Sequence, residues 1–174
     1  MSSLLGEQAG ELGSDHSRWQ LYLLAMESDC GCELLFKAVG LEEDMALASA
    51  VVVRMIERVE KRDREKWIMQ LPVDQRRFAE RRASELSVLC EVVDGAMGAR
   101  EISLQMSEWS DWLQLRVAGR SSSDSVLAVV EELARTKRAR RVSGERRNSS
   151  NVADLTEPLT FHRPSGNGQA VARI

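Results

Sequence analysis

The stretch LEEDMALASAVVVRMIERV, residues 41–59, decides the fold class of this chain. Its apolar side chains recur at steps of three and four residues, which places them on one face of an α-helix. These side chains are Met45, Ala48, Val52, Met55, Ile56 and Val59. Arg54 and Arg58 lie four residues apart on the opposite face. Glu42, Glu43 and Asp44 are expected in the first turn, where the helix dipole favours anions.

Helical periodicity extends outward from this stretch in both directions. It predicts further helices over 18–26, 34–39, 60–71, 74–94, 109–118 and 126–134, with a short element around Ile102, Leu104 and Met106. Ser14 and Asp15 are placed to cap the first helix, and Gly40 and Gly95 are placed to end two others. No segment alternates apolar and polar residues over the length of a strand. The sequence therefore predicts an all-α fold, a compact domain of about seven to eight helices.

The distribution of glycine, serine and proline divides the chain into three parts. At 174 residues it corresponds to about one domain. Residues 1–14 are rich in Gly and Ser and are expected to form a flexible leader, followed by a single helical domain over 15–145. Residues 146–174 contain Pro158 and Pro164 and lack sustained periodicity, so we expect a disordered basic and polar tail there.

The charges are distributed unevenly along the chain. The formal net charge is −3, but residues 1–134 carry 15 Lys and Arg against 24 Asp and Glu, a net of −9. Residues 135–174 carry 9 against 3, a net of +6. An acidic body is a poor candidate for a DNA-binding surface. The basic segment is suited to an anionic partner or to the body itself.

The composition indicates a cytoplasmic protein. With 43% hydrophobic and 29% charged residues it is typical of soluble globular proteins. The sequence has three cysteines, Cys30, Cys32 and Cys90, which cannot all pair with one another, and we see no secretory leader. We therefore expect reduced thiols in a cytoplasm. A ratio of 20 Arg to 4 Lys is typical of GC-rich bacterial genomes. No stretch approaches the roughly 18 apolar residues that span a bilayer, so we expect no membrane partner.

Cys30-Gly31-Cys32 is the pair best suited to a metal ion, because two thiolates can bind zinc. His16 or Cys90 would have to add ligands, since a structural zinc site needs four. The alternative is two small thiols at a helix start. The chain also lacks a zinc-protease motif, a phosphate-binding loop and a nucleophile beside a histidine. We therefore predict no metal, no cofactor and no enzymatic activity, with a helical enzyme that uses a carboxylate site as the remaining alternative.

A helix–turn–helix pattern occupies residues 109–143, WSDWLQLRVAGRSSSDSVLAVVEELARTKRARRVS. An apolar first helix is followed by a short polar turn over 119–124 and by a second apolar helix that ends in basic residues. This stretch resembles a unit of the HEAT or armadillo type. The resemblance implies a short α-solenoid whose concave face binds proteins or nucleic acid. No second copy recurs at a fixed period, so a compact domain with one repeat-like pair is the alternative.

Trp109 and Trp112 lie three residues apart in this unit, on one helical face. Tryptophan and arginine are enriched in the hot spots of protein interfaces. We therefore predict that Trp109, Trp112 and Arg116 bind a partner. Anchoring in the core is the alternative for the two tryptophans.

The segment RTKRARR, residues 135–141, is expected to form the C-terminal end of the last helix, where the dipole favours cations. Together with two downstream arginines it makes a compact positive patch. The candidate residues for binding nucleic acid or an acidic partner are Arg135, Lys137, Arg138, Arg140, Arg141, Arg146 and Arg147. A solvated helix end is the alternative.

These features together predict a non-enzymatic, adaptor- or scaffold-type helical interaction protein. It is expected to bind a protein partner or a second copy of itself. The alternative is a nucleic-acid-associated regulatory or accessory protein that uses the basic C-terminal segment.

Overall fold

The computed structural model of the protein describes residues 14–155, and the side chains of residues 14–149. Within that range the chain forms nine α-helices, two short 3-10 helices and no strand, which confirms the predicted all-α fold. The α-helices are α2 (Asp15–Ala25), α3 (Asp29–Val39), α4 (Met45–Ile56), α5 (Lys61–Ile68), α6 (Arg76–Val93), α7 (Ala99–Gln105), α8 (Asp111–Arg120), α9 (Asp124–Leu133) and α10 (Lys137–Leu155). The 3-10 helices are Val73–Gln75 and Met106–Glu108. None of the described helices combines the length and the apolar character that crossing a bilayer requires.

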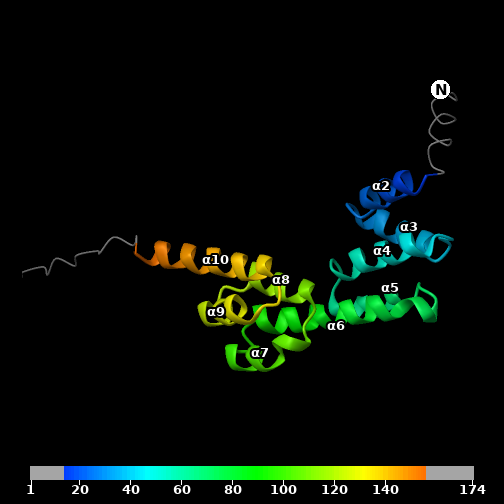
Figure 1. The fold of residues 1–174 in the computed structure, drawn as a ribbon. Coiled ribbons are helices and arrows are strands. Elements are labelled where there is room, and N and C mark those ends of the chain that lie inside the picture. The colour runs from blue at the N-terminus through cyan, green and yellow to red at the C-terminus, as the bar shows by residue number, and fades with distance from the viewer. Residues whose placement is uncertain (1–13, 156–174) are drawn as a thin grey trace, which may run out of the picture.

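Each helix packs mainly against helices close to it in sequence. α2 packs against α3 and α4, α4 and α5 pack against α6, and α6 packs against α8. Farther along the chain, α9 packs against α7 and α8, and α10 packs against α8 and α9. Figure 1 shows α2 to α5 at one end of the molecule and α7 to α10 at the other, with α6 between them. A cluster of buried apolar side chains runs through both ends, from Met26 to Ala139.

The stretch over 41–59 forms a shorter helix than predicted, because α4 begins at Met45 and ends at Ile56. The predicted apolar face is correct. Its buried members are Ala48, Val52, Met55 and Ile56. Arg54 and Arg58 are exposed on the other side, as predicted. The periodicity of the sequence thus identified the buried face of α4 but not the residues at which the helix begins and ends.

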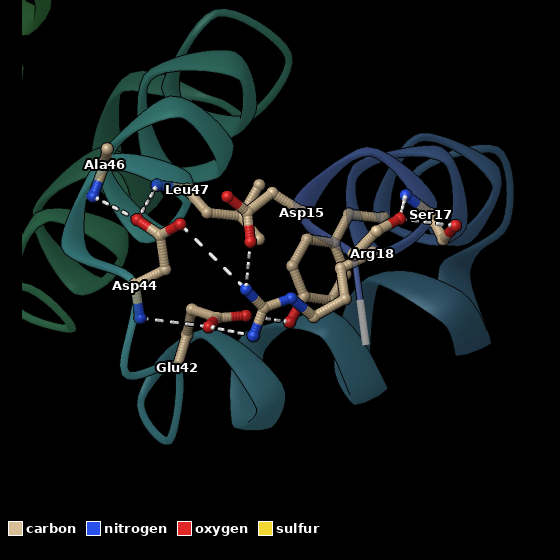
Figure 2. A network of polar contacts seen from close by, with 9 residues as sticks. Asp15, Ser17, Arg18, Glu42, Asp44, Ala46 and Leu47 are labelled. Carbon is tan, nitrogen blue, oxygen red and sulfur yellow. Dashed lines mark hydrogen bonds and ion pairs between the residues drawn. The ribbon is translucent and has the colours of Figure 1, made fainter. Parts of the chain in front are cut away.

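Asp44 caps α4, and this cap explains where the helix begins. Its Oδ1 accepts hydrogen bonds from the backbone N–H of Ala46 at 2.9 Å and of Leu47 at 3.1 Å (Figure 2). A cap side chain satisfies free N–H groups of the first turn, so the helix starts at the next residue. Glu42 and Glu43 consequently precede the helix, and their predicted place in its first turn is wrong.

Glu42 is buried and ties α2 to the loop before α4. Its carboxylate accepts hydrogen bonds from Arg18 Nη1 at 3.0 Å, the Tyr22 hydroxyl at 2.5 Å and the Asp44 N–H at 3.1 Å. Arg18 also pairs with Asp15 at 2.7 Å (Figure 2). Burial raises the pKa of Tyr22 to about 12, and the hydrogen bond to Glu42 acts in the same direction. No side chain within α2 is fully buried, so this polar cluster is a main attachment of the helix.

Two glycines were expected to end helices, and they behave differently. α6 ends at Val93, and Gly95 adopts a φ of 76°, the left-handed conformation that glycine allows. Gly40 directly follows α3 but keeps a right-handed φ of −67°. The end of α3 at Gly40 is therefore as predicted, but its left-handed cap is not formed.

The segment RTKRARR begins a helix instead of ending one. α9 ends at Leu133, the backbone of Ala134 is extended, and α10 begins at Lys137. The Thr136 hydroxyl accepts a hydrogen bond from the Ala139 N–H at 3.2 Å, which is the geometry of an N-cap. The prediction that these cations lie at a helix C-terminus is therefore wrong. They lie at the end of the helix dipole that disfavours cations.

Part of the predicted tail is helical as well. α10 continues to Leu155, so residues 146–155 belong to a helix, and the prediction of disorder is wrong for them. Ser143 is completely buried where α10 packs on the rest of the domain. Of the predicted leader over 1–14, residues 1–13 lie outside the described residues, and Ser14 is the N-cap of α2. The remaining tail over 156–174 also lies outside them.

Candidate functional site

Two adjacent clefts lie where α4, α6 and α8 meet. The first cleft, of about 220 Å³, is lined by the C-terminal part of α4 together with α6 and α8. The second cleft, of about 300 Å³, is lined by α6, the start of α8 and Arg135. Trp112 lines both clefts, so it separates them. We call the lining of the two clefts the arginine–tryptophan surface.

The arginine–tryptophan surface is positively charged on an acidic body. Its seven arginines are Arg54, Arg58, Arg81, Arg82, Arg116, Arg120 and Arg135. Its three carboxylates are Glu57, Glu85 and Asp111, which leaves a net charge of +4. Residues 1–134 carry a net charge of −9, so this concentration of arginine reverses the sign of the body locally.

Trp112 is held in place by arginine side chains. The guanidinium carbon of Arg82 lies 3.5 Å from the centroid of the indole ring, and that of Arg116 lies 5.4 Å from it. Arg82 also lies 5.5 Å from the ring of Phe78, one turn earlier in α6. Such cation–π contacts are attractive, and more so when the cation is shielded from water. The half-buried indole therefore forms a fixed ridge between the two clefts.

Arg82 is a mostly buried cation, and two of its nitrogen atoms lack a hydrogen-bond partner in the described part of the chain. Its side chain is 11% exposed, and its Nε and Nη1 atoms find no hydrogen-bond partner among the residues that the structure describes. Burial lowers the pKa of Arg82; the charges of Glu85 and Glu57 oppose this effect, and Arg116 and Arg81 add to it. Buried donors without partners are uncommon in folded proteins because they cost free energy. A perturbed group of this kind beside a cleft is a candidate binding residue.

Each carboxylate of the surface is already engaged by an arginine. The ion pairs are Glu57 with Arg116 at 3.5 Å, Glu85 with Arg81 at 3.4 Å and with Arg82 at 3.7 Å, and Asp111 with Arg135 at 3.2 Å. The first of these pairs joins α4 to α8 across the first cleft. The carboxylates therefore hold the arginines in place around the clefts.

Trp109 does not belong to this surface, although the sequence predicted it as a binding residue beside Trp112. It lies before the N-cap of α8, is 5% exposed and packs in the core. The two indoles therefore do not share a helical face, and the prediction is wrong for Trp109 because its side chain is not accessible. Trp112 and Arg116 do line the first cleft, and their binding role stays a prediction.

The Lys and Arg residues of the C-terminal segment that were predicted to bind a partner lie in different parts of the structure. Arg135 lines the second cleft, where its Nη1 pairs with Asp111 and its Nη2 donates to the carbonyl of Ser107 at 3.1 Å. Arg147 pairs with Glu131 of α9. Arg135 thus attaches the link between α9 and α10 to the start of α8, and Arg147 attaches α10 to α9. Both side chains are therefore engaged within the domain and do not form one patch with the cations at the start of α10.

The remaining candidates of that segment lie on α10. Arg146 donates a hydrogen bond to the carbonyl of Ser121 at 3.0 Å. Exposed cations near the start of the helix are Lys137, Arg138, Arg140 and Arg141. Arg141 lies 3.5 Å from Glu145 in an exposed i,i+4 pair. The structure therefore leaves a smaller basic patch than the sequence predicted.

Sequence reasoning missed most of the arginine–tryptophan surface. Arg82 and Trp112 are thirty positions apart, and no periodicity links them. The i,i+4 spacings of Phe78 with Arg82 and of Trp112 with Arg116 were the available signals, since such pairs are neighbours on a helix. These spacings predict two separate pairs, whereas the packing of α6 on α8 joins them into one cluster.

The cysteine-containing region offers a cavity with a different character. Cys32 lines a cavity of about 640 Å³ between α3 and α5, beside the edge-on pair of Phe36 and Trp67, whose ring centroids are 5.0 Å apart. Two acids and two lysines on its rim balance in charge. Cys30 and Cys90 are exposed. In the described part of the chain, no group of three or more His, Cys, Asp or Glu is placed to hold a metal ion.

The candidate site is thus a pair of concave, arginine-rich clefts on either side of one fixed tryptophan. The chain matches no protein-family model, no curated protein and no solved structure.

Proposed function

We propose that the protein is a non-enzymatic helical interaction protein that binds a protein partner on the arginine–tryptophan surface. The observation that carries the proposal is Trp112, held by Arg82 and Arg116 on the ridge that separates two clefts. Tryptophan and arginine supply much of the binding energy at protein interfaces, especially where they are partly desolvated and fixed in advance.

The chemistry of the clefts favours binding over catalysis. Their charged groups are arginines, which stay protonated, and carboxylates that are each paired with an arginine. General acid–base catalysis needs a group that can exchange a proton near neutral pH. We also keep as a proposal that α8 and α9 form a repeat-like pair of the HEAT type, since such pairs commonly present binding faces.

Site-specific photocrosslinking in cells that express the full chain tests this proposal. A photoreactive phenylalanine derivative replaces Arg120, an exposed residue of the first cleft. The matched control carries the same derivative at Leu104, which is 76% exposed on α7. We expect a discrete crosslinked protein from the first position that is absent from the second and is lost in the Trp112→Ala background. Identical crosslinks at both positions, or none at either, would contradict the proposal.

The second candidate function is nucleic-acid binding through the start of α10. It is favoured by the four exposed cations, Lys137, Arg138, Arg140 and Arg141, since phosphates are bound by such groups. Binding to duplex DNA, followed by fluorescence anisotropy over a range of salt concentrations, tests it. If this function holds, the triple change of Lys137, Arg138 and Arg140 to Gln weakens binding and reduces the salt dependence, while Trp112→Ala does neither.

A further inference from the structure

The buried guanidinium of Arg82 indicates what kind of group the second cleft accepts. Arg82 lines this cleft, and its side chain is 11% exposed; its Nε and Nη1 atoms are enclosed by surrounding atoms and have no hydrogen-bond partner among the described residues. The Glu85 carboxylate lies 3.7 Å from Nη1, which is an ion pair but too long for a hydrogen bond. A guanidinium carries its N–H donors in one plane, and the groups that pair best with it are carboxylates and phosphates.

The carboxylates near Arg82 are shared with other arginines. Glu85 is shared with Arg81, and Asp111 is paired with Arg135, so the carboxylates that line the second cleft are each engaged by another cation. Arg116 on the far side of Trp112 adds a further positive charge nearby. A buried cation in such surroundings is stabilised by an additional anion, which compensates for the lost hydration.

The shape and composition of the clefts favour a peptide over a nucleic acid. The side chain of Arg82 is 11% exposed, so a projecting side chain can reach it more easily than the backbone of a duplex. Phe78, 58% exposed, supplies an apolar wall beside the cation. Cavities of about 300 and 220 Å³ lie at or below the low end of the ~300–1,000 Å³ typical of small-molecule sites, which suits individual side chains.

Building on the proposed function, we propose that the partner presents an extended acidic segment to this surface. One carboxylate enters the second cleft and forms an ion pair with the accessible part of the Arg82 guanidinium, and a neighbouring apolar side chain packs against Phe78. A second carboxylate lies beyond the Trp112 ridge and pairs with Arg116 in the first cleft. The segment belongs to a different protein, because a folded acidic face of a second copy does not project into two narrow clefts.

A labelled peptide tests this inference with the full-length protein. The probe is a fluorescein-labelled peptide of alternating Glu and Leu, and its counterpart has Gln at every Glu position. Fluorescence anisotropy is expected to show that the acidic peptide binds at least about tenfold more tightly than the Gln peptide, since the ion pairs with the arginines are lost in the latter. Equal binding of the two peptides would overturn the inference.

Two arginine variants form a matched pair for the same assay. Arg82→Met removes the proposed anchor, and Arg64→Met removes another buried arginine with unpartnered Nε and Nη1 atoms that lines neither cleft. We expect Arg82→Met to weaken the acidic peptide at least about tenfold and Arg64→Met to change it by less than about twofold. Should Arg82→Met fail to fold, Arg82→Lys keeps the charge but loses the planar guanidinium, and it is expected to weaken binding by a similar factor. Equal effects of the Arg82 and Arg64 variants would refute the role of Arg82.

The remaining outcomes separate the inference from the proposed function. If the Arg120 position gives a crosslink but the acidic peptide does not bind, the protein-binding surface is supported and the inference that its partner is acidic is overturned. Acidic-peptide binding without a cellular crosslink preserves the carboxylate site and contradicts the proposed function. Stronger competition by single-stranded oligothymidylate than by unlabelled peptide would assign the clefts to nucleic acid. Self-association in sedimentation that is abolished by the peptide and by Arg82→Met would assign them to a second copy.

Discussion

Replacing Gln114 with leucine is expected to loosen the junction between α9 and α10. Gln114 lies in α8 and is 1% exposed. Its Nε2 donates to the carbonyls of Met106 at 3.1 Å and of Trp109 at 3.2 Å. Its Oε1 accepts the backbone N–H of Arg135 at 2.8 Å. Leucine is close to glutamine in volume but offers no polar atom, so Gln114→Leu deletes three hydrogen bonds with little change in packing.

The expected loss of stability follows from the partners left behind. The Trp109 carbonyl still accepts from Arg135 Nη2 at 3.3 Å, and the Met106 carbonyl still accepts from the Trp109 N–H at 3.3 Å. The backbone N–H of Arg135 is left without its acceptor, which costs about 1–3 kcal/mol in a partly buried position. The carbonyls of Met106 and Trp109 each lose one of their two hydrogen bonds as well, so we expect the free energy of unfolding to fall by about 2–3 kcal/mol in total. That is a large part of the roughly 5–15 kcal/mol that stabilises a typical domain.

Urea unfolding followed by circular dichroism and tryptophan fluorescence measures this loss. The matched control is Gln105→Leu, at an exposed position in α7, which is expected to change stability by less than about 0.5 kcal/mol. Because Gln114 also positions Arg135 at the second cleft, Gln114→Leu is expected to weaken acidic-peptide binding as well. A change at Gln114 as small as the control, with an unchanged denaturant slope, would refute the reasoning.

Three further perturbations test the rest of the fold. Gly31→Ala places a Cβ in a steric clash with the backbone oxygen of Ala25, so it is expected to lower stability by about 1–3 kcal/mol. Gly119→Ala, whose Cβ would meet nothing within 4 Å, is expected to raise stability by about 0.5–1 kcal/mol. Thermal unfolding compares the two variants, and a loss of similar size in both would contradict this reading. Tyr22 is the one tyrosine of the sequence, so the absorbance of its ionised form reports its pKa directly, and a value near 10 would show that Glu42 does not hold its hydroxyl. Because its folded pKa of about 12 lies above the ordinary 10.0, the stability it contributes is complete below pH 10 and is lost as the pH rises through about 12; Tyr22→Phe is expected to remove that alkaline dependence.

The sequence by itself determined the fold class and the faces of the helices. The apolar positions of residues 41–59 recur with the helical period, and this face is buried in α4 because burying a continuous stripe removes the most apolar area from water. The residue that caps a helix could also be predicted from the sequence at some helix ends. Ser14 caps α2 by accepting the Ser17 N–H at 3.2 Å, as predicted from the residue type and its position. These features depend on residues within one or two turns of each other.

The tertiary structure alone decided the break between α9 and α10 and the composition of the candidate site. The apolar pattern predicts a helix that runs into RTKRARR, but Gln114 captures the N–H of Arg135 from another helix, and the chain turns there. The same holds for Arg82 and Trp112, whose contact depends on α6 packing against α8. Contacts between side chains twenty or thirty positions apart leave no periodic trace in the sequence, because they depend on how whole helices pack and not on the spacing within one helix.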